Sequence, residues 1–288
     1  MALVVAAGCT NSGPGDGDTA AGSSTTLVPR SIVDRRPFPV ERLEVAYEDG
    51  ERGRALPVVV HHPDGAGRFP FVVLSHGLSA DGPFVTPIAE RLARSGYVVV
   101  APTYPKTSRG RSNLLDVRNQ PADVSFVLDA VLSDPRFSSL VDADLIATGG
   151  HSLGGVTSLM VGFHSCCADD RLDAVFAYAG AAFLAPSGDW FEEPGAPPLL
   201  MLHGDSDDLV LFPLGRDAFE RAAEPKHFVR LLNAEHTPPY VSEQPYFDVV
   251  IEATVAFLDA YVLDDDDALD RLRIVSEADG VSKYEEAA

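Results

Sequence analysis

The order of apolar and polar positions along the chain predicts alternating strands and helices. Short apolar runs bounded by Gly, Pro or polar residues predict strands at 42–47, 55–61, 71–74, 97–101, 144–149, 173–179, 199–202 and 227–232. Apolar positions at helical spacing predict helices at 86–94, 122–132, 155–162 and 214–223, and a long closing helix at 247–262. Such alternation is typical of an α/β fold, in which helices cover both faces of a mostly parallel central sheet. A turn signal at 49–53 makes the first two strands an antiparallel hairpin that leads this sheet.

The same pattern sets the expected domain boundaries. Residues 37–263 hold every predicted strand and helix and contain no segment typical of a linker, so we expect one domain without a large cap. Residues 10–36 are rich in Gly, Ser, Thr and Asp and predict a flexible tether, because they cannot bury enough apolar area to become ordered. Residues 264–288 are acidic and weakly apolar, and we expect a tail that forms a short surface helix or is disordered.

The first nine residues resemble the end of a bacterial lipoprotein signal. Small residues directly precede Cys9, as in a lipobox, and the predicted tether follows it. This resemblance implies lipidation of Cys9 and export to the cell envelope or the extracellular space of a bacterium, with a membrane tether through the lipid. The alternative is a leader segment of no consequence. No stretch of the sequence approaches the apolar length of a membrane-spanning helix.

The net charge narrows the classes of electrostatic partner. The chain has 22 Lys and Arg against 43 Asp and Glu, a formal net charge of −21. This balance argues against nucleic acids and anionic membrane surfaces as electrostatic partners.

Three cysteines are few for a disulfide scaffold. We expect the adjacent Cys166 and Cys167 to be small, partly buried side chains, and a vicinal disulfide is the alternative.

One turn carries the motif of a catalytic serine. Gly150-His151-Ser152-Leu153-Gly154 matches G-x-S-x-G and lies between a predicted strand and a predicted helix. Its glycines let the two backbones approach closely, and the bend aims the Ser152 hydroxyl out of the sheet, near the positive end of the helix. The motif is short, and the alternative is an ordinary serine in a glycine-rich turn. The flanking strand and helix favour the nucleophile.

A serine nucleophile needs a general base and an acid that orients the base. Functional groups of open α/β sheets gather at the carboxyl ends of strands, so the base and the acid are expected in the loops that follow the strands. His236 follows the last predicted strand and is the expected general base. Asp205, Asp207 and Asp208 follow the preceding strand; Asp207 is our choice for the orienting acid and Asp208 the second choice.

Backbone N–H groups of Leu78 and Leu153 are the candidate donors of an oxyanion hole. Leu153 stands at the predicted helix start, and Leu78 belongs to the loop Ser75-His76-Gly77-Leu78 after a central strand, where Gly77 lets the backbone turn inward. Side chains that we expect to contact substrate are His151, Trp190 and Phe212.

Four segments, in this order, resemble the α/β-hydrolase superfamily: Ser75-His76-Gly77-Leu78, Gly150-His151-Ser152-Leu153-Gly154, His203-Gly204-x-x-Asp207 and Glu235-His236. The resemblance spans about residues 40 to 262. The first segment and residues 121–129 are similar to the branch without a cap, which holds dienelactone-hydrolase-like proteins, platelet-activating-factor acetylhydrolases, chlorophyllases and polyester-cleaving cutinases. The resemblance implies a Ser152–His236–Asp207 triad with Leu78 and Leu153 as oxyanion donors.

Together these observations predict a serine carboxylic-ester hydrolase that forms an acyl-enzyme on Ser152. Without a cap, we expect an open cleft for small to bulky esters, including lipid esters or polyesters such as PET. We expect a monomer that uses no cofactor and no metal, since the sequence has no His-Glu-x-x-His or Cys-x-x-Cys motif. Two alternatives are a peptidase or amidase of the same fold, and a non-catalytic binding protein on this scaffold.

Overall fold

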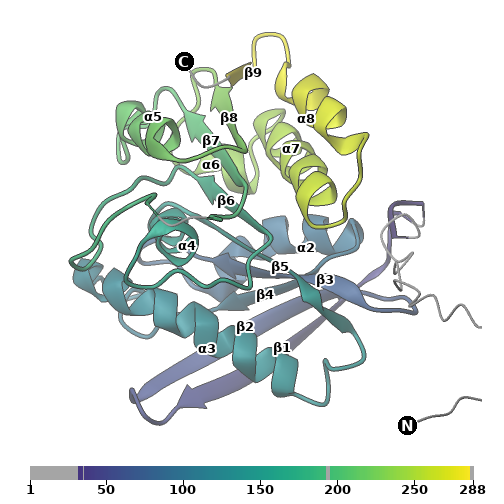
Figure 1. Cartoon of the computed structure of the whole chain (residues 1–288), viewed down its shortest axis with the longest axis vertical. Coiled ribbons are helices and arrows are strands. Elements are labelled where there is room, and N and C mark those ends of the chain that lie inside the picture. Colours follow the sequence, from purple (N-terminus) through teal and green to yellow (C-terminus); the bar gives the residue numbers. More distant parts are fainter. Residues whose placement is uncertain (1–31, 35, 193–194, 286–288) are drawn as a thin grey trace, which may run out of the picture.

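The centre of the molecule is a sheet built from the apolar runs of the sequence. The computed structural model describes residues 32–34, 36–192 and 195–285. Within them, nine strands form one sheet in the order β1-β2-β4-β3-β5-β6-β7-β8-β9 (Figure 1). The strands are β1 (Val40–Asp49), β2 (Arg54–Pro63), β3 (Phe69–Ser75), β4 (Val98–Pro102), β5 (Val141–His151), β6 (Ala174–Tyr178), β7 (Leu199–Gly204), β8 (Lys226–Leu231) and β9 (Ser282–Glu285).

The pairing confirms the predicted fold class. β1 and β2 form an antiparallel hairpin, and the six strands from β3 to β8 run parallel to one another. The central strands β3, β4, β6 and β7 are buried along their whole length, which explains their continuous apolar runs. β2 meets β4 in an antiparallel pair, so the hairpin extends the parallel sheet at one edge.

Helices cover both faces of this sheet, as the helical spacing of apolar residues predicts (Figure 1). They are α2 (Thr86–Arg94), α3 (Gln120–Ser133), α4 (Leu153–Phe163), α5 (Phe212–Arg221), α6 (Pro238–Val241), α7 (Tyr246–Tyr261) and α8 (Ala268–Ser276), with short 3₁₀ turns η1 (Gly82–Val85) and η2 (Leu114–Asn119). Helix α4 is buried at every position, which places it between the sheet and the loops that cover it. No helix among the described residues has the length and apolar character needed to cross a bilayer.

The folded part begins before the predicted boundary at residue 37. Ile32 is buried in the hydrophobic core. The guanidinium of Arg36 donates two hydrogen bonds of 2.6 Å to the carboxylate of Asp259 in α7. Residues of the predicted tether therefore pack on the domain near its closing helix. Residues 1–9, including Cys9, and the tether up to residue 31 lie outside the described residues.

The segment after residue 263 forms a short helix, one of the two expected alternatives, and adds a strand that was not expected. Helix α8 packs on α7, and β9 adds an antiparallel strand to β8 at the far edge of the sheet. His227 of β8 contacts the hydroxyl of Tyr284 through Nδ1 at 2.6 Å and the hydroxyl of Tyr261 through Nε2 at 2.7 Å. These contacts tie the segment to the domain, which its acidic composition alone does not indicate.

The expectation of two reduced cysteines is wrong in this structure. The sulfur atoms of Cys166 and Cys167 are joined in a vicinal disulfide just after the end of α4. Cys167 packs against a small apolar cluster that includes Leu153 and Met160 of that helix.

One buried histidine of the hairpin makes a pH-dependent contribution to stability. His61 of β2 is 2% exposed, and neither of its ring nitrogens has a hydrogen-bond partner among the described residues. Burial, reinforced by the nearby charge of Arg42, lowers its pKa from 6.5 to about 4. Between these values the unfolded chain binds a proton that the folded chain does not. The stability that His61 contributes is complete above pH 6.5 and is lost as the pH falls to about 4.

We therefore predict that His61→Leu flattens the pH dependence of stability. Between pH 6.5 and 4, the free energy of unfolding of the variant should fall less steeply than that of the wild type, by about 1.4 kcal/mol per pH unit. Urea unfolding at several pH values measures both slopes. Val59→Ala is the control, because it weakens the same strand without removing a titrating group. An unchanged slope in His61→Leu would contradict the prediction.

Candidate active site

Ser152 lies on a sharp turn between β5 and α4, where the sequence motif predicts it. Its backbone has φ 58° and ψ −120°, a conformation that non-glycine residues rarely adopt. Close packing holds the turn in place. A Cβ on Gly154 would stand 2.1 Å from the carbonyl oxygen of Ser75 at the end of β3, and one on Gly150 would stand 2.5 Å from the backbone of Gly154. The two glycines therefore let the turn lie directly against the neighbouring strand end.

The structure brings Ser152, His236 and Asp207 together from three separate loops. The Ser152 hydroxyl lies 2.8 Å from Nε2 of His236. Nδ1 of the same ring lies 2.7 Å from Oδ2 of Asp207. Because a carboxylate only accepts, Nδ1 carries the proton and Nε2 presents its lone pair to the hydroxyl. This tautomer is the one that can accept a proton from serine.

Asp207 is held as a carboxylate by the groups around it. Its side chain is fully buried, and Oδ1 accepts hydrogen bonds of 2.9 Å from the N–H groups of Leu209 and Val210. Burial alone would raise its pKa. The contacts with His203 and His236 and the backbone N–H groups outweigh this effect and hold the pKa of Asp207 well below its usual range. Asp208, the second choice for the acid, is exposed, and Asp205 instead contacts Arg230.

Two further imidazoles surround this chain of hydrogen bonds. Nε2 of His151 donates to the carbonyl oxygen of His236 at 2.7 Å, so the turn that carries Ser152 also holds the loop that carries His236. Burial and the proximity of His236 lower the pKa of His151 to about 4, which keeps it neutral. Nε2 of His203 donates to the carbonyl oxygen of Val210 at 2.7 Å and lies 3.4 Å from Asp207. The sequence motifs contain both histidines but do not indicate these contacts.

The loop after β3 is positioned by the side chain of His76. Nε2 of His76 accepts a hydrogen bond from the N–H of Tyr104, so its Nδ1 carries the proton and donates to the carbonyl oxygen of Gly77 at 2.7 Å. In a trans peptide the C=O and the next N–H point in opposite directions. The N–H of Leu78 therefore points away from His76. The N–H groups of Leu78 and Leu153 make no hydrogen bond with another described residue.

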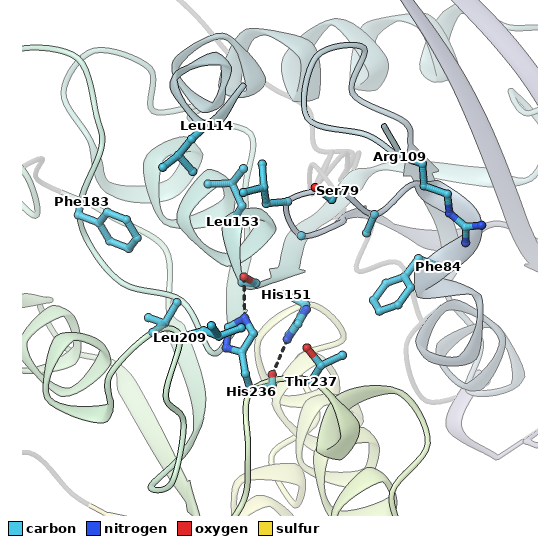
Figure 2. Close-up of a pocket in the computed structure, with 15 residues that line it drawn as sticks. Ser79, Phe84, Arg109, Leu114, His151, Leu153, Phe183, Leu209, His236 and Thr237 are labelled. Carbon is cyan, nitrogen blue, oxygen red and sulfur yellow. Dashed lines mark hydrogen bonds between the residues drawn. The ribbon is translucent and has the colours of Figure 1, made fainter. Parts of the chain in front are cut away.

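A cleft of about 820 Å³ opens over Ser152. Figure 2 shows His236 between two parts of the cleft: Leu114, Leu153, Phe183 and Leu209 lie on one side, and Ser79, Phe84, Arg109 and Thr237 on the other. Three of the apolar residues, Leu114, Phe183 and Leu209, are exposed. Their exposure in loops after strand ends could not be recognised from the sequence.

Of the three expected substrate contacts, one lines this cleft. His151 borders it, although the ring is mostly buried. Trp190 instead packs edge-on against His164, with ring centroids 4.8 Å apart. Phe212 packs edge-on against Phe228 of β8. Both aromatic side chains belong to the packing of the domain rather than to the described cleft.

The mostly parallel sheet, the leading hairpin and a Ser–His–Asp chain at the strand ends define an α/β hydrolase. Comparison with known proteins makes this more specific: residues 29–178, just over half of the chain, match the family model for chlorophyllase. The chain belongs to the chlorophyllase family, and membership implies a serine esterase. No curated protein matches the chain. The matched segment includes Leu78 and Ser152 and ends before Asp207 and His236.

The close approach at Gly154 leads to a prediction. Gly154→Ala forces a Cβ against the backbone of Ser75, and neither backbone can yield without moving the strand end. We expect the free energy of unfolding to fall by at least about 2 kcal/mol, with a loss of esterase activity, since the loop with Leu78 begins at the same strand end. Urea unfolding and hydrolysis of p-nitrophenyl butyrate measure the two effects.

Gly50→Ala is the matched control. A Cβ at Gly50 meets no heavy atom within 4 Å, and we expect a change in stability within about 0.5 kcal/mol. Equal effects of the two substitutions would show that the contact with Ser75 does not constrain the turn.

Proposed function

We propose that the protein hydrolyses carboxylic esters through an acyl-enzyme on Ser152, with His236 as general base and Asp207 as the acid that orients it. The observation that carries the proposal is the continuous hydrogen-bonded chain from the Ser152 hydroxyl through His236 to the buried carboxylate of Asp207. A serine hydroxyl is a weak nucleophile at neutral pH, and this arrangement supplies the base that it needs.

In the first half of the reaction, the ester carbonyl lies in the cleft next to the Ser152 hydroxyl. Oγ attacks the carbonyl carbon while its proton moves to Nε2 of His236. The carboxylate of Asp207 stabilises the imidazolium through Nδ1–H and does not take the proton. The tetrahedral intermediate then breaks its bond to the alcohol oxygen, which receives the proton from Nε2 and leaves.

In the second half, water replaces the alcohol. Nε2 of His236 takes a proton from the water as its oxygen attacks the acyl carbon. The second tetrahedral intermediate releases the acid, and the proton returns to Oγ of Ser152. The overall reaction consumes one ester and one water and yields one alcohol and one acid.

Two backbone N–H groups stabilise the negative oxygen in both intermediates. The N–H of Leu153 is at the start of α4, where the helix dipole favours negative charge. The second donor is the N–H of Leu78, whose peptide is oriented by the hydrogen bond from His76 to Gly77. Donors held in place before the reaction need no reorganisation when charge develops.

The cleft favours esters with a sizeable apolar group. Its walls are mainly Leu, Phe, Val and Ala side chains, and it opens to solvent over the nucleophile. Leu209, which is 72% exposed, and Leu114 extend the apolar surface to the rim. A bulky lipid or polyester chain could lie across such a cleft, and the family name makes a chlorophyll ester one substrate to test. The apolar walls also distinguish the site from one built for a peptide backbone, which needs polar partners.

We predict that Ser152→Ala abolishes ester hydrolysis. Activity toward p-nitrophenyl acetate, butyrate and longer esters should fall by about 10⁴-fold or more, while the circular dichroism spectrum and urea midpoint stay close to the wild type. In the wild type, rapid mixing should reveal a burst of p-nitrophenol equal to the enzyme concentration if deacylation is the slower half. Retained hydrolysis by Ser152→Ala would reject the nucleophile.

The acid is tested by a matched pair of neighbouring residues. Asp207→Asn should lower kcat by about a thousandfold or more, because the amide no longer holds His236 in the productive tautomer. Asp208→Asn removes the same charge from an exposed position next to it, and we expect kcat to change by less than about threefold. A larger loss in Asp208→Asn than in Asp207→Asn would reverse the assignment.

A further inference from the structure

One end of the cleft carries a charge that the proposed reaction does not use. Among the described residues that line the cleft, Arg109 is the side chain with a permanent charge. It lies beside Phe84, on the side of His236 opposite Leu114, Phe183 and Leu209 (Figure 2). The cleft therefore has an apolar part and a part that ends at a cation.

The Arg109 guanidinium is held in place from outside the cleft. Its Nε lies 2.8 Å from Oδ2 of Asp81. Asp81 is itself fixed, because its Oδ1 accepts a hydrogen bond of 3.1 Å from the N–H of Phe84 at the start of η1. A guanidinium has five N–H donors in a planar fork. With 69% of the Arg109 side chain exposed, one carboxylate leaves donors available for a second anion.

The segment that carries Arg109 is basic, although the chain as a whole is acidic. The segment from β4 to the start of α3 contains four exposed cationic side chains, Lys106, Arg109, Arg111 and Arg118. Its one acidic residue, Asp116, is buried and paired with Arg54. On the other side of the cleft, the chain neighbour of Leu209 is the exposed acid Asp208. The chain as a whole has a net charge of −21. This basic segment is therefore the part of the cleft that attracts an anion rather than repelling it.

We propose that Arg109 is a specificity-determining residue that binds an oxyanion on the substrate. The favoured substrates are esters that carry a carboxylate or similar anionic group at a distance from the scissile bond, such as half-esters of dicarboxylic acids. This inference rests on the proposed function, since the ester must react at Ser152 while its anionic end reaches Arg109. The planar guanidinium suits a carboxylate in a bidentate arrangement.

The experiment compares anionic esters with neutral esters of equal length. One series places the anion on the acyl side: monoethyl esters of dicarboxylic acids of increasing length, each paired with its ethyl methyl diester. The other places it on the alcohol side: acetate esters of ω-hydroxy acids, each paired with the methyl ester of the acid. Hydrolysis of each bond is followed in a pH-stat with product identification.

In the wild type, kcat/KM for the anionic member should exceed that for its neutral partner in one of the series, at chain lengths long enough to reach Arg109. Arg109→Gln should reduce this ratio by about fivefold, which corresponds to about 1 kcal/mol for an exposed ion pair. Hydrolysis of the neutral member should change by less than twofold. Arg109→Lys should restore part of the preference, because it keeps the charge and loses the fork.

Arg94→Gln is the matched control, because it removes the same charge from an exposed position on α2 that does not line the cleft. It should leave the ratio unchanged. The inference is wrong if Arg109→Gln leaves the ratio unchanged in both series, or if it lowers hydrolysis of anionic and neutral esters equally. If the wild type hydrolyses anionic and neutral esters equally well, the anion site is refuted but the proposed function is not. A wild type that hydrolyses no ester refutes the proposed function and this inference with it.

Discussion

The contact between two backbones, at Gly154 and Ser75, is the constraint on which the site depends. The turn after β5 lies so close to the end of β3 that a single methyl group would not fit between them. Consequently the Ser152 hydroxyl and the loop with Leu78 are held at one separation by the packing of the sheet itself. Two strands that are adjacent in the sheet but distant in sequence thus hold the proposed nucleophile and the proposed oxyanion donor at a fixed distance. A rigid scaffold of this kind is what preorganised catalysis requires.

The histidines around Asp207 determine which groups of the site carry a charge. His151 is neutral and anchors the backbone of His236. A second positive ring at this position would oppose protonation of His236 in the proposed reaction. His203 supports the acid from the other side, through its contacts with Asp207 and with the carbonyl of Val210. The site therefore contains three imidazoles around one carboxylate, and each of them makes a different set of hydrogen bonds.

Much of the fold could be predicted from the sequence, because its central strands are continuous apolar runs and the apolar residues of its helices recur at helical spacing. The predicted helix 86–94 has the bounds of α2. The turn that carries Ser152 lies between β5 and α4, where the G-x-S-x-G motif predicts it. The chain ends were harder, because what orders them is distant in sequence: Asp259 binds Arg36, and His227 contacts Tyr284. Local composition contains no sign of such contacts. Trp190 and Phe212 were expected at the cleft as apolar side chains, but they are partly buried and pack against the core instead.

The last strand has a consequence for how the chain can be shortened. β9 is short, but it covers the hydrogen-bonding edge of β8. A chain cut at residue 263, where the composition changes, would leave the backbone N–H and C=O groups of β8 open to solvent. Bare sheet edges of this kind recruit strands from other molecules and lead to aggregation. The C-terminal segment thus protects the β8 edge of the sheet, the one opposite β1, from pairing with a second copy.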